Sequence, residues 1–309
     1  MNTLYHFKVA DLWLALELPP DIDSGNLLPS FRSFCCNNPP PGLQPAFACS
    51  AAATPATSTT CRPCQALETA INGAWKTIIG SDAAGHYVLE VCHTGHPSHQ
   101  LELAPDFRSG RLYLQPADPL AGEALSTLLR IAFSQVLLLH QGVSLHASAV
   151  VLNGQGFLFT GCSGTGKSTH AARWTSAFEG CTLLNDDNPA VRLKDEQFRV
   201  YGTPWSGKTP CYRNLSVPLG GIVRLRQAPR NAYTPCRGIE AFTTLLASSA
   251  LVTSQDALSD SLHTTLVQMV DAIPVGRLDC LPTTAAAQCC AQGLQTHREQ
   301  FHSNHHTDF

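Results

Sequence analysis

The chain has 309 residues, and at about 150 residues per domain this length favours two domains with a sizeable buried core. Hydrophobic residues make up 44% of the chain and charged residues only 14%, against roughly 25% charged in an average globular protein, which excludes general disorder. Twenty Lys and Arg residues against 23 Asp and Glu residues give a net charge of −3. We therefore expect no nucleic-acid partner, because binding to a phosphate backbone needs a basic excess.

The N-terminal segment and the apolar runs bear on membrane association. No uncharged apolar run approaches the roughly 18 to 20 residues that span a bilayer, so we expect no membrane partner. Lys8 and Asp11 interrupt the first apolar stretch, which we interpret as a retained first strand and not as a signal peptide.

The cysteines indicate the redox compartment. Their number, 13, is odd, and they are scattered from Cys35 to Cys290, which favours a reducing, cytoplasmic location over a secreted disulfide scaffold. Cys61 and Cys64 have the C-x-x-C spacing of a zinc or redox site, but no second such pair lies nearby to complete a zinc cage. We expect ordinary turn cysteines there, with the metal or redox reading left open.

Residues 1–118 are predicted to form a smaller β-rich domain. Short apolar segments separated by turn residues indicate strands at 5–18, 87–92, 100–103 and 111–115. The stretch 19–64 is rich in Pro, Ser, Thr, Asn and Gly, a composition that favours turns and exposed loops.

The period of the apolar residues changes after residue 118. From 118 to 140 they recur at intervals of three and four, which predicts a helix leading into a second domain over residues 119–296. From residue 143 onward short apolar strands alternate with helices and Gly-rich turns, which indicates a mixed α/β core. There we expect strands at 220–225 and 276–280 and helices at 239–250 and 258–272, followed by a flexible His-rich tail over residues 297–309.

A Gly-rich segment in this second domain has the P-loop (Walker A) pattern. Gly161-Cys-Ser-Gly-Thr-Gly-Lys167-Ser168 satisfies G-x-x-x-x-G-K-[ST] and follows the apolar strand 156–160. Such glycines let successive backbone N–H groups point inward around phosphate oxygens, and the helix that follows adds the positive end of its dipole. We predict a nucleotide site, although a Gly-rich turn alone is also a common link between a strand and a helix. The predicted nucleotide-binding residues are Gly161, Ser163, Gly164, Thr165, Gly166, Lys167, Ser168 and Thr169.

Two adjacent carboxylates follow the loop at short range. A helix over 167–178 and a strand over 181–185 lead to Asp186 and Asp187, only 19 residues after Lys167. If this strand runs parallel to strand 156–160 through a right-handed crossover, its end returns beside the loop. One acid is then placed to ligate Mg²⁺ with the Ser168 hydroxyl, and the other to accept a proton from an attacking hydroxyl. Which acid takes which role stays open. The alternative is a polar turn that ends the strand, which the nearby phosphate loop disfavours.

A predicted hairpin brings a histidine toward the same place. Asn153-Gly154 between two apolar runs is a strong hairpin signal. Counting outward from this turn sets His146 opposite Gly161, or opposite Ser163 in the next register. A histidine there can hydrogen-bond a phosphate or orient an acceptor, and the alternative is a histidine of the sheet edge with no such role.

Together these residues resemble the catalytic domain of the HPr serine kinase/phosphorylase family, whose core is similar to that of ATP-dependent phosphoenolpyruvate carboxykinases. The shared features are His146 on a strand, the loop Gly161–Ser168 with Ser163 in place, and the pair Asp186-Asp187 ending the next strand. The match is specific over about residues 144–192. The resemblance implies a mixed-sheet P-loop domain and an MgATP-dependent transfer to an alcohol, usually a serine hydroxyl, with one acid of the pair as base.

The chain also departs from that family. Thr169 follows the loop serine where the bacterial kinases usually carry Glu, and their Leu-Glu-Ile-Arg-Gly-like signature is missing. Its place is taken by the segment 201–214. There Lys208 or Arg213 is placed to steady charge on the γ-phosphate, unless these cations are merely solvated. Trp205 either stacks on adenine or packs in the core.

We therefore expect a two-domain cytoplasmic kinase that uses ATP and Mg²⁺. Lys167 would hold the phosphates, Ser168 and Asp187 the Mg²⁺, and Asp186 would act as base, with His146, Lys208 and Arg213 assisting catalysis. The favoured acceptor is a serine of a protein or peptide. Two alternatives remain, a kinase of an amino acid or metabolite that includes carboxykinase-like enzymes, and an ATP-binding regulator without transfer. The identity of the acceptor, the reverse reaction and the oligomeric state are left open.

Overall fold

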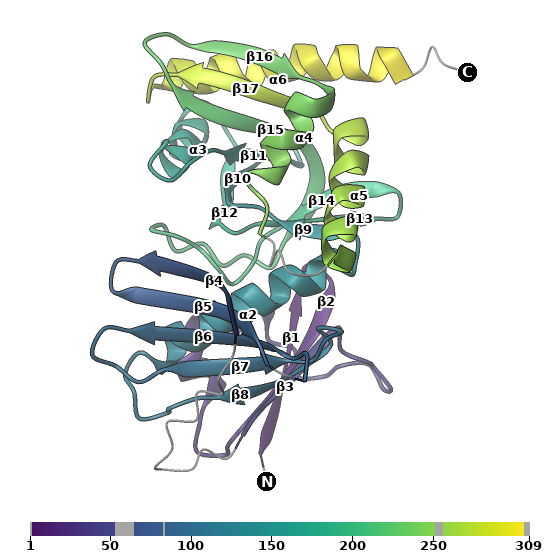
Figure 1. Cartoon of the computed structure of the whole chain (residues 1–309). Coiled ribbons are helices and arrows are strands. Elements are labelled where there is room, and N and C mark those ends of the chain that lie inside the picture. The colour runs from purple at the N-terminus through teal and green to yellow at the C-terminus, as the bar shows by residue number, and fades with distance from the viewer. Residues whose placement is uncertain (1, 53–64, 83, 251–255, 306–309) are drawn as a thin grey trace. The chain divides into compact units, whose positions relative to one another are not determined.

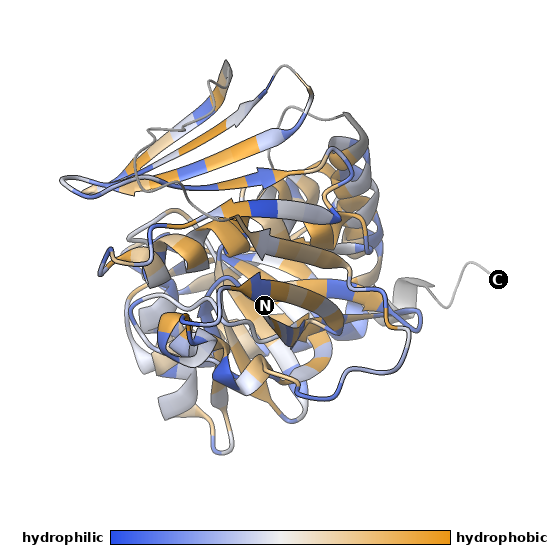
Figure 2. Cartoon of the chain, turned by 90° about the horizontal axis from the view of Figure 1, so that it is seen from below, coloured by the Kyte–Doolittle hydropathy of each residue, from blue (hydrophilic) through white to orange (hydrophobic). Residues whose placement is uncertain are grey.

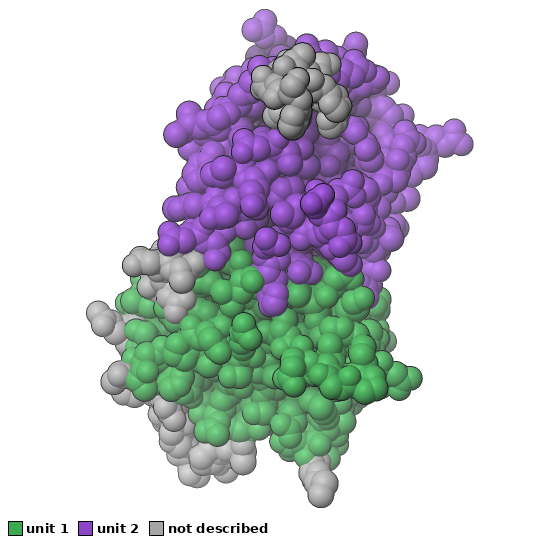
Figure 3. All heavy atoms as spheres, turned by 90° about the vertical axis from the view of Figure 1, so that its right-hand side faces the viewer, with its two compact units in different colours: residues 1–139, 251–258 green, residues 140–250, 259–309 purple. Residues whose placement is uncertain are grey.

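The computed structural model describes residues 2–52, 65–82, 84–250 and 256–305 and divides the chain into two compact units. Unit 1 comprises Met1–Leu139 and Leu251–Leu258, and unit 2 comprises His140–Ala250 and Ser259–Phe309 (Figure 3). The expected boundary after residue 118 differs from this division, because the helix that follows it packs on strands of unit 1. The predicted fold class, a β-rich part followed by a mixed α/β part, is confirmed.

Unit 1 is built on an eight-stranded sheet with the order β1-β2-β3-β8-β7-β6-β5-β4 (Figure 1). Its strands are β1 (Thr3–Val9), β2 (Leu12–Leu18), β3 (Phe47–Ala51), β4 (Gln65–Asn72), β5 (Trp75–Ser81), β6 (Tyr87–His93), β7 (His99–Leu103) and β8 (Ser109–Tyr113). Its helices are α1 (Ser24–Leu27), the 3-10 helix η1 (Pro29–Phe34) and α2 (Ala121–Leu138).

Two predictions for unit 1 were wrong in part. The single strand expected over 5–18 is a hairpin, because Ala10 and Asp11 adopt positive φ angles of 49° and 61° and turn β1 back onto β2. The stretch expected to consist of turns and exposed loops contains β3 and η1, and Phe31 and Phe34 of η1 are buried. These aromatic side chains supply apolar anchors that the turn-rich composition around them conceals. Cys61 and Cys64 lie outside the described residues.

Helix α2 confirms the predicted helical period. Its buried residues recur at intervals of three and four, and the helix packs on β6 and β7. By length and composition alone α2 would suffice to cross a membrane, but 67% of that window is buried inside the protein. Burial of this extent is what the core helix of a folded domain shows.

Unit 2 contains a nine-stranded mixed sheet whose main path is β12-β10-β11-β15-β14-β13-β9, with β17 beside β15 and β16 beside β17 (Figure 1). The strands are β9 (Gly142–Ser144), β10 (Ala147–Leu152), β11 (Gln155–Thr160), β12 (Thr182–Asp187), β13 (Ala190–Lys194), β14 (Gln197–Tyr201), β15 (Ser216–Gln227), β16 (Ala232–Cys236) and β17 (Val275–Cys280). The helices are α3 (Lys167–Ala177), α4 (Gly238–Leu246), α5 (Asp256–Ala272) and α6 (Thr284–His305).

The core of unit 2 lies between this sheet and the helices α3 and α6. One cluster of buried residues joins Val150, Phe159 and Leu225 of the sheet to Trp174 of α3 and Leu294 of α6. Strands β10 and β11 are buried along most of their length, whereas buried and exposed residues alternate at the end of β15, where Arg224 and Arg226 are exposed and Leu225 is buried. Hydrophobic and hydrophilic residues are both found along the strands in Figure 2. Polar side chains are therefore available at the end of β15 to line a site.

The expected flexible tail from residue 297 is instead helical through His305, as part of α6. His297 is 1% exposed, and its Nδ1 lies 3.0 Å from the hydroxyl oxygen of Tyr233. Tyr233 also packs against Gly293 of the same helix. Packing against β16 thus orders a histidine-rich segment whose composition alone favours a solvated end.

Candidate active site

The site begins with the hairpin of β10 and β11, which has the predicted two-residue turn. Asn153 and Gly154 both have positive φ angles, 51° and 72°, as a turn of the primed type requires. The register pairs Ala147 with Thr160, so one further step sets His146 opposite Gly161. This is the first of the two predicted registers, and it brings His146 to the mouth of the Gly-rich loop.

The Gly-rich loop leaves the end of β11 and enters α3. Gly161, Gly164 and Gly166 have φ angles of 142°, 79° and 104°, in a region that only glycine adopts readily. Thr165 closes the turn, since its backbone N–H donates to the Cys162 carbonyl at 3.1 Å. Gly166 occupies the N-cap position of α3, so the free N–H groups of the first helical turn face the loop.

The side chains of the loop have the exposure that a phosphate site needs. Ser163 lies exposed in the loop, and Ser168 and Thr169 lie exposed on the first turn of α3. The Lys167 Nζ donates to the Gly161 carbonyl at 3.1 Å, so its amine lies inside the curl of the loop. The predicted nucleotide-binding residues therefore all lie in the loop and in the first turn of α3, and their roles stay a prediction.

The acid pair returns to this loop by the expected crossover. Strand β12 runs in the direction of β11, but β10 lies between them and is antiparallel to both. Partial burial lowers the pKa of the Lys167 ammonium, whereas the charges of Asp187 and Asp186 raise it. Both carboxylates are thus close enough to act electrostatically on the lysine of the loop.

Asp186 lies deeper than its neighbour. It is 3% exposed, and the Ser148 hydroxyl donates to its Oδ1 at 2.6 Å from the paired position on β10. Its Oδ2 is buried and has no hydrogen-bond partner among the described residues. A buried carboxylate oxygen without a donor is costly in a folded protein, so it marks a place where a proton or a cation completes the site.

Asp187 faces the mouth of the loop. Its Oδ1 lies 3.9 Å from the His146 Nε2, and the two side chains are 37% and 52% exposed. The Asn188 side-chain amide donates to its other carboxylate oxygen. The accessible carboxylate of Asp187 and the exposed Ser168 hydroxyl are hard oxygen donors, the kind of ligand that a hydrated Mg²⁺ ion takes.

The segment after β14 is tied to the acid pair. The Asn185 side chain donates to the Trp205 carbonyl at 3.0 Å, and the Gly207 N–H donates to the Asp186 carbonyl at 2.8 Å. Lys208 follows directly and is exposed, as is Arg213. Trp205 is 6% exposed and packs in the domain, which answers the open question of whether it stacks on adenine.

Two cavities border the loop on the side of β15 and β17. One, of about 530 Å³, lies between Cys162–Thr165 and the side chains of Arg224, Arg226 and Arg277. The other, of about 600 Å³, lies along the start of α3 and is lined largely by apolar residues, among them Leu225, Pro229, Leu281 and Pro282. The Gln227 amide donates to the Gly164 carbonyl at 3.3 Å and borders both cavities.

Sequence reasoning missed the residues that support the site from other strands. The available signal for Ser148 was its spacing. It stands two residues after His146, and residues two apart on a strand point to the same side. Arg224 and Arg226 of β15 lie more than 50 residues from Arg277 of β17 and from the loop, and no motif marks them. Only the pairing of the strands brings them together.

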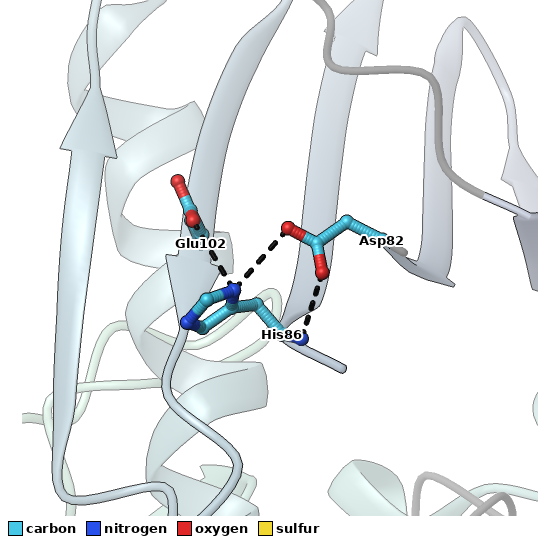
Figure 4. Close-up of side chains that lie close together, drawn as sticks. All are labelled: Asp82, His86 and Glu102. Carbon is cyan, nitrogen blue, oxygen red and sulfur yellow. Dashed lines mark hydrogen bonds and ion pairs between the residues drawn. The ribbon is translucent and has the colours of Figure 1, made fainter. Parts of the chain in front are cut away.

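A second cluster of titratable groups lies in unit 1 and has a structural role. The His86 Nδ1 lies 3.2 Å from Asp82 Oδ2 and 3.7 Å from Glu102 Oε1 (Figure 4). Asp82 Oδ1 also accepts the backbone N–H groups of Ala84 and His86, and these bonds lower the pKa of the Asp82 carboxyl. The cluster closes the turn between β5 and β6, as a carboxylate in a turn commonly does.

Two comparisons found known proteins that are similar to this chain. A family model described as "SynChlorMet cassette protein ScmC" matches residues 124–281, just over half of the chain. Among solved structures, the HPr(Ser) kinase/phosphatase from Coxiella burnetii is similar, with 14% sequence identity and a TM-score of 0.33. That match covers 53% of this chain and 98% of the other. The search of curated proteins returned no match. From the extent of the family match, the chain belongs to the family of the SynChlorMet cassette protein ScmC.

Proposed function

We propose that this protein is an ATP- and Mg²⁺-dependent phosphotransferase that phosphorylates a hydroxyl group, with a serine of a protein or peptide as the favoured acceptor. The observation that carries the proposal is the register of β10, which pairs Ala147 with Thr160 of β11 on one side and with Asp187 of β12 on the other, so the acid pair and the start of the loop lie at the same end of the sheet. A loop that served only as a turn would not require two carboxylates beside its lysine.

Each group takes a role that suits its surroundings. Lys167 and the backbone N–H groups of the loop hold the phosphates, and the apolar cavity along α3 takes the nucleoside. Asp186 is the base, because its Oδ2 is buried with no donor among the described residues and has capacity for a proton. His146, beside Asp187 at the mouth, orients the acceptor or a phosphate oxygen.

The proposed reaction is an in-line displacement. The acceptor hydroxyl oxygen bonds to the γ-phosphorus while the bond from that phosphorus to the β–γ bridging oxygen breaks, and ADP leaves with that electron pair. The hydroxyl proton passes to Asp186. Lys208, next to the Gly207 contact with the acid pair, is placed to offset the negative charge that shifts toward the leaving group. Mg²⁺, held by Ser168 and Asp187, supplies neutralising charge on the phosphate oxygens.

A second candidate function is phosphorylation of a small acidic metabolite. The arginines beside the loop favour it, because guanidinium groups are suited to carboxylate and phosphate recognition. A nucleotide-binding regulator without transfer is the third candidate, but it has less need of two carboxylates beside the lysine.

Labelled ATP distinguishes these candidates. The protein is incubated with [γ-³²P]ATP and Mg²⁺, alone, with serine peptides and with a small-molecule extract. Label in a peptide or protein supports the favoured function, label in a metabolite supports the second candidate, and tight ATP binding without any transfer overturns both.

Two matched substitutions assign the carboxylates. Asp186→Asn should abolish transfer at every Mg²⁺ concentration while ATP still binds, because it removes the proton acceptor. Asp187→Asn should weaken the response to Mg²⁺ and recover in part at high Mg²⁺ or Mn²⁺. If the recovery by metal is seen with Asp186→Asn instead, the two roles are reversed.

A further inference from the structure

A cluster of three arginines borders the loop on the side away from the acid pair. Strand β15 pairs in parallel with β17, and the register sets Arg224 beside Arg277 and Arg226 beside Asp279. Side chains two residues apart on a strand share a face, so all four lie on one side of the sheet. The alternate residues Leu225 and Leu278 point to the opposite side, into the core.

The charges in this cluster do not cancel. Arg226 is held by Asp279 through two hydrogen bonds of 2.6 Å, and Arg277 by Glu240 through one of 3.0 Å. Among the residues that the structure describes, no carboxylate lies within ion-pair distance of Arg224. Three guanidinium groups thus face two carboxylates and leave an excess positive charge at Arg224.

The cluster also has spare donor capacity in a cavity of suitable size. The Arg277 Nε is buried and makes no hydrogen bond within the described part of the chain, since Asp279 Oδ1 lies 3.9 Å away. The cavity of about 530 Å³ that these arginines share with Cys162–Thr165 has room for a small acid or an acidic side chain. The neighbouring cavity is the better place for a purine, because its lining is more apolar.

We propose that Arg224, supported by Arg277, binds the carboxylate or phosphate group of an anionic ligand beside the loop. No residue of the acid pair lines this cavity, so the proposal goes beyond the proposed function and does not depend on the identity of the phosphate acceptor. Planar guanidinium groups bind carboxylates and phosphates through paired hydrogen bonds, and an arginine without a carboxylate partner has these donors free. The ion pairs of Arg226 and Arg277 hold the wall of the cavity in place.

Anion titration tests the site directly. The full-length protein is saturated with Mg²⁺ and the non-hydrolysable analogue AMP-PNP, and succinate and inorganic phosphate are titrated separately by calorimetry. We expect one anion to bind with the loop already occupied. The probe with the higher affinity shows whether the site prefers a carboxylate or a phosphate. Arg224→Gln should weaken that binding at least tenfold, whereas Arg230→Gln, which removes an exposed arginine outside the cavity lining, should change it less than twofold.

A variant that is expected to strengthen anion binding serves as the second check. Asp279→Asn removes the carboxylate that holds Arg226, so the probe that binds the unmodified protein should bind this variant more tightly. Failure of both probes to bind the AMP-PNP complex overturns the proposal. It is also overturned if Arg224→Gln weakens AMP-PNP binding itself, because the cavity then belongs to the nucleotide.

A third arm separates this proposal from the proposed function. In Lys167→Ala the loop loses its lysine, yet succinate or phosphate should still bind through Arg224. If AMP-PNP does not bind the unmodified protein but the Arg224-dependent anion does, the kinase proposal fails and the anion site stands.

Discussion

The Ser148 hydroxyl donates a 2.6 Å hydrogen bond to Asp186 Oδ1 across the β10–β12 pair, and both side chains are buried. This bond fixes one carboxylate oxygen, and the other, Oδ2, has no hydrogen-bond partner among the described residues and is the oxygen that we propose as the base. A side chain buried this completely cannot rely on water for its orientation, so the serine is a positioning residue for the acid.

Replacing Ser148 therefore tests the role of Asp186. Ser148→Ala should destabilise the protein by about 1–3 kcal/mol, because a buried carboxylate oxygen loses its donor. It should lower kcat for transfer about tenfold and leave the KM for MgATP within twofold, because that donor positions the acid and not the nucleotide. Ser148→Thr keeps the hydroxyl and should restore both stability and kcat. An unchanged kcat in Ser148→Ala would show that this bond does not position a catalytic base.

Lys167 is expected to decide nucleotide binding. Lys167→Ala should weaken binding of MgATP at least 100-fold, measured by calorimetry, because the amine that reaches the phosphates is lost. Lys194→Ala removes an exposed lysine of the same unit and should leave the affinity within twofold. Equal affinities for all three proteins would contradict a triphosphate site at the loop.

Gly207 lies against the acid pair and tolerates no larger side chain without movement. A Cβ atom there would lie 2.7 Å from the Asp186 carbonyl oxygen, closer than real Cβ contacts. Gly207→Ala should therefore displace this segment from the pair and reduce transfer at least tenfold while ATP affinity changes less than twofold. Thr209→Ala is the control, because the Ser206 hydroxyl donates to the backbone carbonyl of Thr209, which this substitution leaves in place. Full activity of Gly207→Ala would exclude a catalytic part for this segment.

His170 makes stability depend on pH. Burial lowers its pKa from 6.5 to about 4, and its Nε2 accepts a 3.0 Å hydrogen bond from the Trp174 indole. Between these two pKa values the unfolded chain binds a proton that the folded chain does not, so stability falls as the pH decreases through that range and levels off below about 4.

The measurement is denaturant unfolding at about pH 7.5 and pH 5, followed by tryptophan fluorescence. His170 should account for a loss of about 2 kcal/mol between these conditions, and His170→Gln should remove most of that loss. A pH dependence as steep in His170→Gln as in the unmodified protein would exclude this assignment.

Asp118 should make the protein less stable as the pH falls further. Burial would raise the pKa of its carboxyl, but hydrogen bonds from His99 and His96, at 2.8 Å and 2.7 Å, lower it to about 2. The stabilisation is therefore complete above the unfolded pKa of 3.8 and is lost as the pH falls toward 2. Asp118→Asn should flatten the fall in stability measured from about pH 5 to pH 3, whereas Asp106→Asn, at an exposed position, should not.

Structural features that depend on residues close together in the sequence could be predicted well. The turn at Asn153-Gly154, the Gly-rich loop and helix α3 follow from positive φ preferences and helical period over short stretches. The return of Asp186 and Asp187 to the loop also followed from chain length, because a short crossover leaves few places for the strand to go. The composition of residues 19–64 and of the His-rich end, by contrast, gave no signal for η1 or for the last turns of α6.

The sequence by itself thus determined the loop, the acid pair and the hairpin that presents His146. Tertiary structure alone decided that Ser148 meets Asp186, that Arg224 stands beside Arg277, that Trp205 is buried and that α2 packs in unit 1. The reason is physical. Turns and helices are specified by backbone preferences within a few residues, whereas cross-strand neighbours are set by sheet register and by the burial of apolar faces contributed from distant parts of the chain.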